Sequence, residues 1–354
     1  MKIGLLLDSF KGTLSQLELT QLVSEKLKAD HEVESFIISD GGDGFVEAIH
    51  ALWPELDYVT YPTKNCYHED IESHYVFDRS HHVAWLECAQ TVGIHKTKER
   101  HPLDATSYYL GLEIKRVLEE GATTINLGLG GSATNDCGLG MMQALGATIT
   151  LDNGQDYTCP RDIKHIISID FKGINAQVNL LSDVDNVLTG YQGASFIYGG
   201  QKGLSLEEMA TIDQDISDLM GRLHLEKESQ VPGTGAAGGL GFSGFTYLKG
   251  TMKSGARFLL DCIDYKHKQA TWDLMITGEG ALDDQSLMGK LIGVILSETT
   301  TPHKYALVGI NKLSYNPFDK VYVTSDYKGS EYSLKHPKEA LNATLDVLVK
   351  DLER

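Results

Sequence analysis

The stretch Met1-Lys-Ile-Gly-Leu-Leu-Leu-Asp8 decides the fold. Its centre, residues 3–7, is short, continuous and aliphatic, which is typical of a strand buried on both faces of a parallel sheet. A capping-box pattern begins at Ser15, and leucines and valines follow it at helical spacing. A second strand is expected at 36–38, so the chain opens with a strand–helix–strand unit.

The far end of the chain repeats this alternation. Residues 274–277, 305–308 and 321–323 are expected to be strands separated by helical stretches. The two ends therefore predict one Rossmann-like, doubly wound parallel sheet of the α/β class, with a second α/β domain inserted into it. We place the Rossmann-like domain at 1–62 and 271–354, and the inserted domain at 63–270.

Composition limits the possible partners. The 354 residues include 31 lysines and arginines against 49 aspartates and glutamates, a net charge of -18, which repels nucleic acid and anionic lipid. No segment approaches the roughly 18 consecutive apolar residues of a membrane helix. The five cysteines form no C-x-x-C pair, which favours a reducing compartment. We therefore expect a cytoplasmic protein that binds neither nucleic acid nor membrane.

A glycine-rich stretch follows the apolar run at 122–127: Asn126-Leu-Gly-Leu-Gly-Gly-Ser-Ala-Thr-Asn-Asp-Cys-Gly-Leu-Gly140. Its five glycines would let backbone N–H groups approach a bulky anion at the start of a helix, where the dipole also favours negative charge. The stretch also fits the dinucleotide fingerprint G-x-G-x-x-A, with Asp152 as the acidic partner. A second fingerprint at 233–238 follows a polar segment in place of a strand, and no Walker A pattern occurs.

Four further loops place carboxylates among glycines or hydroxyls after expected strands. They are Asp8-Ser-Phe-Lys-Gly12, Asp40-Gly-Gly-Asp-Gly44, Ser182-Asp-Val-Asp-Asn186 and Thr277-Gly-Glu-Gly-Ala-Leu-Asp-Asp-Gln-Ser286. Each alone is also compatible with a solvated turn whose aspartates cap the next helix. Together, at the carboxyl ends of strands, they predict a site for a polyanion bridged by a divalent metal, which suits phosphoryl transfer.

These loops together resemble the type I glycerate kinase family. The matching segments run in order from the first strand to about residue 294 and include Asp8-Ser-Phe-Lys-Gly-Thr-Leu14, Gly128-Leu-Gly-Gly-Ser-Ala-Thr-Asn-Asp136, Gln201-Lys-Gly203 and Ile276-Thr-Gly-Glu-Gly280. The resemblance implies an active site in a cleft between two α/β domains. It also implies phosphorylation of D-glycerate by ATP with Mg²⁺, giving 2-phosphoglycerate. Ala281 departs from the family, which usually has an arginine there.

The residues expected to carry the reaction fall into three groups. The catalytic candidates are Asp8, Lys11, Asp185 and Asp283, of which Asp8 or Asp283 would accept the hydroxyl proton. The candidates for binding phosphate or substrate are Ser9, Asp40, Asp43, Gly128, Gly130, Gly131, Ser132, Thr134, Asn135, Lys202, Gln285 and Lys290. The candidates for binding Mg²⁺ are Asp183, Asp185 and Glu279. The protein is expected to be a monomer or a homodimer.

Two interpretations of other classes stay open at this point. A nicotinamide-dependent oxidoreductase would need Asp152 to bind a ribose. A sensor of sugar acids without catalytic activity is favoured only if the arginine that Ala281 replaces is essential.

Overall fold

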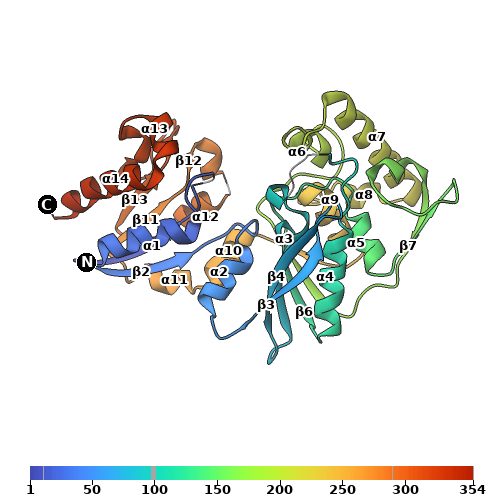
Figure 1. Ribbon diagram of the computed structural model, residues 1–354, viewed down its shortest axis with the longest axis horizontal. Coiled ribbons are helices and arrows are strands. Elements are labelled where there is room, and N and C mark those ends of the chain that lie inside the picture. The colour runs from blue at the N-terminus through green and yellow to red at the C-terminus, as the bar shows by residue number, and fades with distance from the viewer. Residues whose placement is uncertain (11, 97–100, 289, 354) are drawn as a thin grey trace. The chain divides into compact units, whose positions relative to one another are not determined.

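The protein consists of two compact units, seen in a computed structural model that describes residues 1–10, 12–96, 101–288 and 290–353 (Figure 1). Unit 1 is Met1–Ser39 together with Ala256–Arg354, and unit 2 is Asp40–Gly255. The boundaries at 39/40 and 255/256 lie earlier in the chain than the predicted 62/63 and 270/271. A boundary at 62/63 would cut through β3 (Asp57–Lys64), which pairs along its length with β4 (Asp70–Asp78) in unit 2.

The sheet of unit 1 has five strands, all parallel. Their spatial order is β2 (Glu32–Ile37), β1 (Lys2–Leu7), β11 (Leu274–Gly278), β13 (His303–Val308) and β15 (Lys320–Val323). Counted along the chain this is the order 2-1-3-4-5, a doubly wound arrangement whose direction reverses between β1 and β11. The predicted fold class is confirmed, because strands from both chain ends pair side by side.

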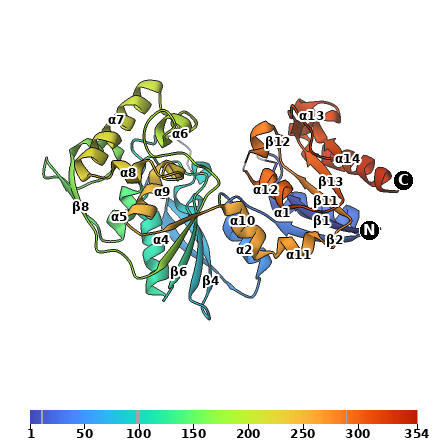
Figure 2. The same ribbon diagram turned by 180° about the vertical axis from the view of Figure 1, so that it is seen from behind.

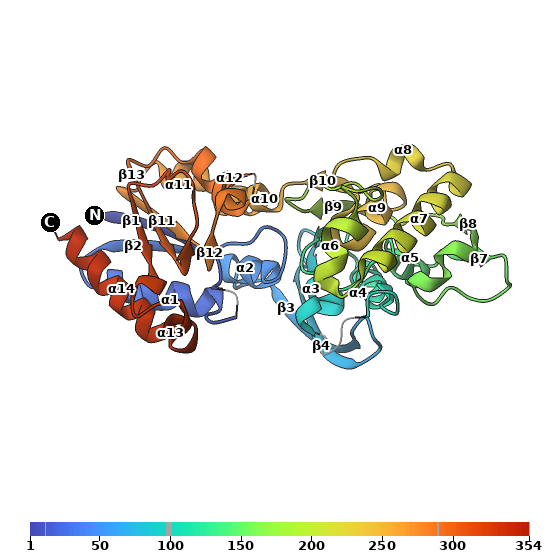
Figure 3. The same ribbon diagram turned by 90° about the horizontal axis from the view of Figure 1, so that it is seen from above.

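Helices cover both faces of this sheet (Figure 3). On one side are α1 (Gln16–Leu27), α13 (Ser330–Lys335) and α14 (Pro337–Leu352), and on the other are α10 (Gly255–Cys262), α11 (Tyr265–Gln269) and α12 (Leu291–Glu298). The α1 helix starts where predicted, since the Ser15 hydroxyl accepts the backbone N–H of Glu18. Leucines and valines of α1 and α14 pack with β1 and β11 in one continuous core.

The sheet of unit 2 has six strands in an order that follows the chain. From one edge to the other they are β10 (Thr251–Lys253), β9 (Gln177–Leu181), β6 (Thr124–Gly128), β5 (Val83–Glu87), β4 and β3. The first four are mutually parallel, whereas β4 and β3 are antiparallel to their neighbours. The sheet of unit 2 therefore contains no reversal of strand order like the one between β1 and β11.

The helices of unit 2 complete two packed groups. Against the sheet and each other lie α2 (Phe45–Leu52), α3 (Ala89–Val92), α4 (Tyr108–Glu119), α5 (Leu139–Ala144) and α9 (Ala236–Thr246). A second group contains α6 (Ala194–Lys202), α7 (Leu206–Leu223) and α8 (Glu226–Ser229), in which α6 and α7 pack together (Figure 2). The α7 helix begins with a capping box, since Ser205 and Glu208 each accept the other's backbone N–H. In the described part of the chain, the helices are too short or too polar to cross a bilayer.

Candidate active site

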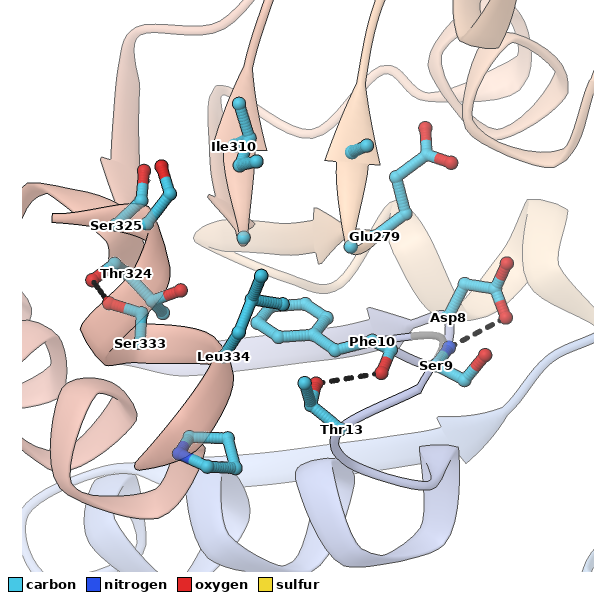
Figure 4. A pocket seen from close by; sticks show the side chains of 15 residues that line it. Asp8, Ser9, Phe10, Thr13, Glu279, Ile310, Thr324, Ser325, Ser333 and Leu334 are labelled. Carbon is cyan, nitrogen blue, oxygen red and sulfur yellow. Dashed lines mark hydrogen bonds between the residues drawn. The ribbon is translucent and has the colours of Figure 1, made fainter.

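A cavity of about 330 Å³ opens at the carboxyl ends of the strands of unit 1 (Figure 4). It includes the ends of β1 and β11, between which the strand order reverses, and such a reversal is the position at which doubly wound sheets bind ligands. Leu7 and Gly278 are register partners, and the Asp8 amide donates to the Gly278 carbonyl at 2.8 Å, so the two loops leave the sheet side by side. The lining residues are Asp8, Ser9, Phe10, Thr13, Glu279, Gly280, Ala281, Gly309, Ile310, Thr324, Ser325, Ser330, Ser333, Leu334 and Pro337.

Two carboxylates, Asp8 and Glu279, stand at one end of this cavity (Figure 4). Burial raises the pKa of Glu279 above its ordinary value; a hydrogen bond with Ser286 opposes that rise, and the nearby Asp8 carboxylate adds to it. One carboxylate oxygen of Glu279 is buried without a hydrogen-bond partner among the described residues. A buried acceptor without a donor is costly, so this oxygen is suited to a ligand proton or a cation.

The loop that follows Glu279 contains a further carboxylate, Asp283, which caps the start of a short helical turn. One oxygen of Asp283 accepts the backbone N–H groups of Gln285 at 2.9 Å and Ser286 at 3.1 Å, which caps the 3₁₀ turn Asp284–Leu287. Asp283 does not line the cavity, whereas Asp8 does. Of the other predicted residues here, Gln285 is exposed, and Lys290 is exposed at the N-cap of α12. Lys11 lies outside the described residues.

The departure from the family pattern falls at the cavity. Ala281 begins the two-residue strand β12 (Ala281–Leu282), which pairs with β14 (Ile310–Asn311). Ala281 lines the cavity. The described residues that line the cavity include no lysine, arginine or histidine. An arginine in this position would bring a guanidinium group to the same wall.

In unit 2, the glycines of the predicted phosphate loop pack against a second glycine loop. A Cβ on Gly128 would lie 2.3 Å from the Gly41 carbonyl oxygen, and one on Gly130 would lie 2.5 Å from the Gly42 Cα. Only glycine allows backbones to approach this closely. Gly131 differs, since it is exposed, has a φ of +67° and meets no atom nearer than 3.6 Å. Gly131 is therefore the member of this set most open to an anion.

The polar side chains of the same loop point into unit 2. Ser132, Thr134 and Asn135 are buried, as is Lys202 at the end of α6. The Lys202 ammonium donates to the Ser132 hydroxyl at 3.1 Å and to the Thr134 carbonyl at 2.7 Å, and Asn135 donates to the Ser195 hydroxyl at 3.0 Å. Burial lowers the pKa of Lys202 to about 8. In this structure Lys202, predicted to contact phosphate, supports the glycine-rich loop from inside.

The helix that follows this loop already has an anion at its start. One carboxylate oxygen of Asp136 accepts the amide and hydroxyl of Ser107, both at 2.7 Å, and the amide of Gly140 at 3.3 Å, while the other accepts the amide of Gly138 at 3.0 Å. Burial raises the pKa of Asp136, and these four hydrogen bonds oppose the rise. The α5 N-terminus, expected to receive a phosphate, is therefore satisfied by the chain's own carboxylate.

Glu87 is a second buried acid, and it was not among the residues predicted from the sequence. At the end of β5 it accepts the backbone N–H groups of Gly44 at 3.3 Å and Val46 at 3.0 Å, and the side-chain amide of Gln90 at 2.8 Å. Burial and the nearby Glu47 carboxylate raise the pKa of Glu87. Glu87 thereby fixes the end of the glycine loop that contains Asp40 and Asp43. The signal was present in the sequence, since an acid directly ends an apolar strand, as Asp8 does.

The remaining predicted carboxylates lie on loops at or near the surface of unit 2. Asp40 is exposed and accepts the Gly42 amide at 2.9 Å, Asp43 lies 3.8 Å from a ring nitrogen of His95, and Asp183 accepts the Ser254 hydroxyl at 2.6 Å. Asp185 is exposed. No set of three or more His, Cys, Asp or Glu side chains able to hold a metal ion occurs within residues 1–10, 12–96, 101–288 and 290–353.

The structure removes the basis for a nicotinamide site. The strand before Asp152, β7 (Thr148–Leu151), pairs antiparallel with β8 (Ile166–Asp170), whereas the neighbours of β6 are β5 and β9. The strand–helix–strand unit that the fingerprint requires is therefore not formed, and Asp152 instead bonds to His165 at 2.9 Å. In the second fingerprint, a Cβ on Gly238 would lie 1.9 Å from the Thr134 carbonyl oxygen, so that glycine serves loop packing.

A doubly wound sheet with carboxylates at its reversal point, in a chain whose other unit contains a glycine-rich loop, fits the class of small-molecule kinases. Comparison with known proteins confirms that class, because the relatives of this chain are named as kinases. The chain belongs to the glycerate kinase family, whose model matches residues 3–350. The resemblance found in the sequence is thereby confirmed.

Individual relatives match most of the chain. Glycerate kinase of Bacillus cereus is 34% identical over 311 residues, covering 82% of this chain and 80% of its own length. Glycerate 2-kinase of Escherichia coli is 34% identical over 313 residues, covering 83% and 81%. A crystal structure of a protein assigned as glycerate kinase 2 of Salmonella typhimurium LT2 aligns with a TM-score of 0.80 at 28% identity, covering 100% of this chain and 98% of that one.

Proposed function

We propose that this protein transfers the γ-phosphoryl group of ATP to D-glycerate and forms 2-phosphoglycerate and ADP. The observation that carries the proposal is the pair Asp8 and Glu279 at the reversal point of the sheet, in a chain that matches the glycerate kinase family over nearly its whole length. The relative from Escherichia coli is named as a glycerate 2-kinase, which supports the 2-position of the product. A cytoplasmic location, and a monomer or homodimer without nucleic-acid or membrane partners, belong to the same proposal.

In this reaction a glycerate hydroxyl oxygen attacks the γ-phosphorus while the bond to the bridging oxygen of ADP breaks. The hydroxyl proton must leave, and a carboxylate in hydrogen-bond reach can accept it. Asp8 lines the cavity, whereas Asp283 caps a turn with one of its carboxylate oxygens. Asp8 is therefore the stronger candidate for the base. The exposed Lys290 is available to neutralise phosphate or the glycerate carboxylate.

The carboxylates fit the expected Mg²⁺. Magnesium is usually held by one or two carboxylates, water and substrate phosphates, so a preformed cluster of three side chains is not required. The unpartnered buried oxygen of Glu279 suits this role in unit 1, as do Asp183 and Asp185 in unit 2. Bound there, the ion would neutralise charge on the transferred phosphoryl group.

The other predicted residues keep supporting roles in this proposal. Gly131 is the exposed part of the glycine-rich loop, and Lys202 would hold that loop in shape from inside without touching phosphate. Contacts of Ser9, Asp40, Asp43 and Gln285 with substrate, and the location of the reaction in a cleft between the two units, stay predictions.

The test is a coupled assay of ADP release from ATP and Mg²⁺, with D-glycerate, L-glycerate or no acceptor, followed by phosphorus NMR of the product. We expect turnover with D-glycerate alone and a resonance of 2-phosphoglycerate. Turnover with another sugar acid but not with D-glycerate would contradict the proposed substrate. If the wild type shows no turnover and Ala281→Arg restores it, the chain has lost its activity through the replacement at position 281.

A further inference from the structure

The cavity of unit 1 has three chemically distinct zones along its length (Figure 4). Asp8, Ser9 and Glu279 gather at one end. Phe10 and Leu334 lie side by side in the middle, with Ile310 above them. The hydroxyl residues Thr324, Ser325 and Ser333 form the opposite end.

This lining does not match glycerate. A three-carbon acid is small and anionic, whereas the cavity has a volume of about 330 Å³, at the lower limit of the roughly 300–1,000 Å³ typical of sites for larger organic ligands. The charged groups of its wall are both carboxylates, and the wall includes no basic residue from the described part of the chain. The glycerate carboxylate would therefore meet repulsion from these two carboxylates, and no counter-charge from the described lining residues.

The same lining suits a ring system with polar atoms at its edge and a charged group at one end. Apolar side chains in the middle can cover the faces of a flat heterocycle, and Phe10 adds an aromatic ring. At the hydroxyl end, Ser333 donates to the Thr324 carbonyl at 2.9 Å and is thus committed. The Ser325 side chain also lines this end, and its hydroxyl can hydrogen-bond to ring nitrogens and exocyclic groups.

We propose that this cavity binds the nucleoside of the phosphoryl donor, with the base between the apolar side chains and the hydroxyls, and the phosphates at the end with Asp8 and Glu279. Phosphates can approach two carboxylates when a divalent cation lies between them, which agrees with the unpartnered oxygen of Glu279. The location agrees with the reversal point of the sheet, where doubly wound folds bind nucleotides. The assignment rests on the proposed function, in that a nucleoside triphosphate is the donor.

The test uses a substitution that fills the hydroxyl end of the cavity with a large side chain. Ser325→Trp places an indole there while keeping the backbone hydrogen bond from the Ser325 amide to the Gly309 carbonyl. Asp326→Trp is the matched control, because Asp326 is the next residue of the same 3₁₀ turn, Thr324–Asp326, and is exposed outside the lining. Calorimetry would measure binding of the non-hydrolysable analogue AMP-PNP with Mg²⁺, and of tripolyphosphate with Mg²⁺, which has no nucleoside.

We expect Ser325→Trp to weaken AMP-PNP binding at least about tenfold, and Asp326→Trp to leave it within about twofold of the wild type. Tripolyphosphate should bind equally to all three proteins, since it does not reach the hydroxyl end. In kinetics, the KM for ATP should rise in Ser325→Trp while the KM for D-glycerate stays unchanged. A second variant, Leu334→Glu, adds a charge to an exposed side chain in the apolar zone and should weaken AMP-PNP in the same way.

Unchanged AMP-PNP affinity in folded Ser325→Trp and Leu334→Glu would overturn the assignment. A rise in the KM for D-glycerate with unchanged AMP-PNP binding would also overturn the assignment. It would indicate that the cavity binds the acceptor, D-glycerate. If wild-type protein binds AMP-PNP with the expected sensitivity to Ser325→Trp yet phosphorylates no glycerate, the cavity assignment holds and the proposed substrate fails. The two failures are thus separate.

Discussion

The carboxyl edges of the two sheets are built from similar sequence patterns and differ in what the loops enclose. In unit 1 the loops after β1 and β11 leave a cavity of about 330 Å³, with an unpartnered carboxylate oxygen of Glu279 beside it. In unit 2 the loops after β6 and before α2 close on each other, glycine against glycine. Asp136, in the loop after β6, is buried and hydrogen-bonded within the unit, as is Lys202 at the end of α6.

The difference shows that a glycine after a strand indicates that another group lies close to its backbone. It does not indicate whether that group is a ligand or another part of the chain. At Gly130 the approaching group is another loop of the same protein. A carboxylate at the end of a strand is similarly ambiguous, because Glu87 fixes a loop whereas Asp8 lines a cavity. Substitutions that remove one function and leave the other can separate the two cases.

The largest effect is expected from Asp8→Asn. If the Asp8 carboxylate accepts the hydroxyl proton, turnover should fall about 10²–10⁴-fold with little change in stability, because the amide cannot take the proton. Steady-state kinetics with D-glycerate and thermal unfolding would measure both. Asp30→Asn is the control, since it makes the same charge change at an exposed site of unit 1 outside the cavity lining. Turnover within about twofold of the wild type in Asp8→Asn would remove Asp8 as the base.

Gly130→Ala tests the closed edge of unit 2. Its Cβ would lie 2.5 Å from the Gly42 Cα, so the loops must separate, and we expect a loss of about 1–3 kcal/mol in the free energy of unfolding. Gly221→Ala, in α7 with no atom within 4 Å of the new Cβ, should instead gain about 0.5–1 kcal/mol. Urea denaturation compares the two variants. Lost turnover with unchanged stability in Gly130→Ala would show that the loop acts on a ligand.

The pH dependence of stability tests the burial of Lys202. Its pKa of about 8 lies below the ordinary value of 10.5, so the unfolded chain binds the proton more tightly. The cost of burying the charged form is complete below pH 8 and disappears as pH rises toward 10.5. Its neighbours Cys88, Asp136 and Cys66 oppose this shift in pKa.

Relative to Lys202→Met, the wild type should therefore gain about 1–2 kcal/mol in the free energy of unfolding between pH 8 and about pH 10. Urea titrations at both pH values measure the difference. Lys227→Met, at an exposed position in α8, should leave the pH dependence as in the wild type. A parallel response of wild type and Lys202→Met would show that the ammonium group is solvated and accessible to a ligand.

The smallest effect is expected from Asp283→Ala. Loss of the cap on the turn Asp284–Leu287 should cost about 0.5–2 kcal/mol, while turnover falls less than about tenfold. Asp283→Asn keeps a capping oxygen and should recover most of the stability. A fall in turnover as large as that of Asp8→Asn, in both variants of Asp283, would make Asp283 the base.

Much of the fold was predictable from local patterns. The aliphatic runs of β1, β11, β13 and β15 identified four strands of unit 1, and the capping pattern at Ser15 identified the start of α1. The boundary between units was less accessible, because β3 carries polar residues and joins its sheet through pairing with β4, which is a tertiary property.

The candidate site was predictable in outline only. Carboxylates after strands pointed to Asp8 and Glu279, since parallel strands bring their carboxyl ends to one edge. The burial of Lys202 was not accessible, because lysines are rarely buried and nothing in its flanking glycines indicates a bond to the Thr134 carbonyl. The cavity itself is formed by residues from five separate segments, among them α13 and the turn at 324–326, which carry no motif.

The pairing of β1 with β11 has a consequence for synthesis of the protein. The amide of Lys2 bonds to Asp273, 271 residues later in the chain, and the two strands are neighbours in the sheet. At translation rates of about 5–20 residues per second, the aliphatic strand Lys2–Leu7 leaves the ribosome roughly 15–50 s before its partner. All of unit 2 is synthesised in that interval and is free to fold first. The open edge of β1 is then the segment that a nascent-chain chaperone would have to cover.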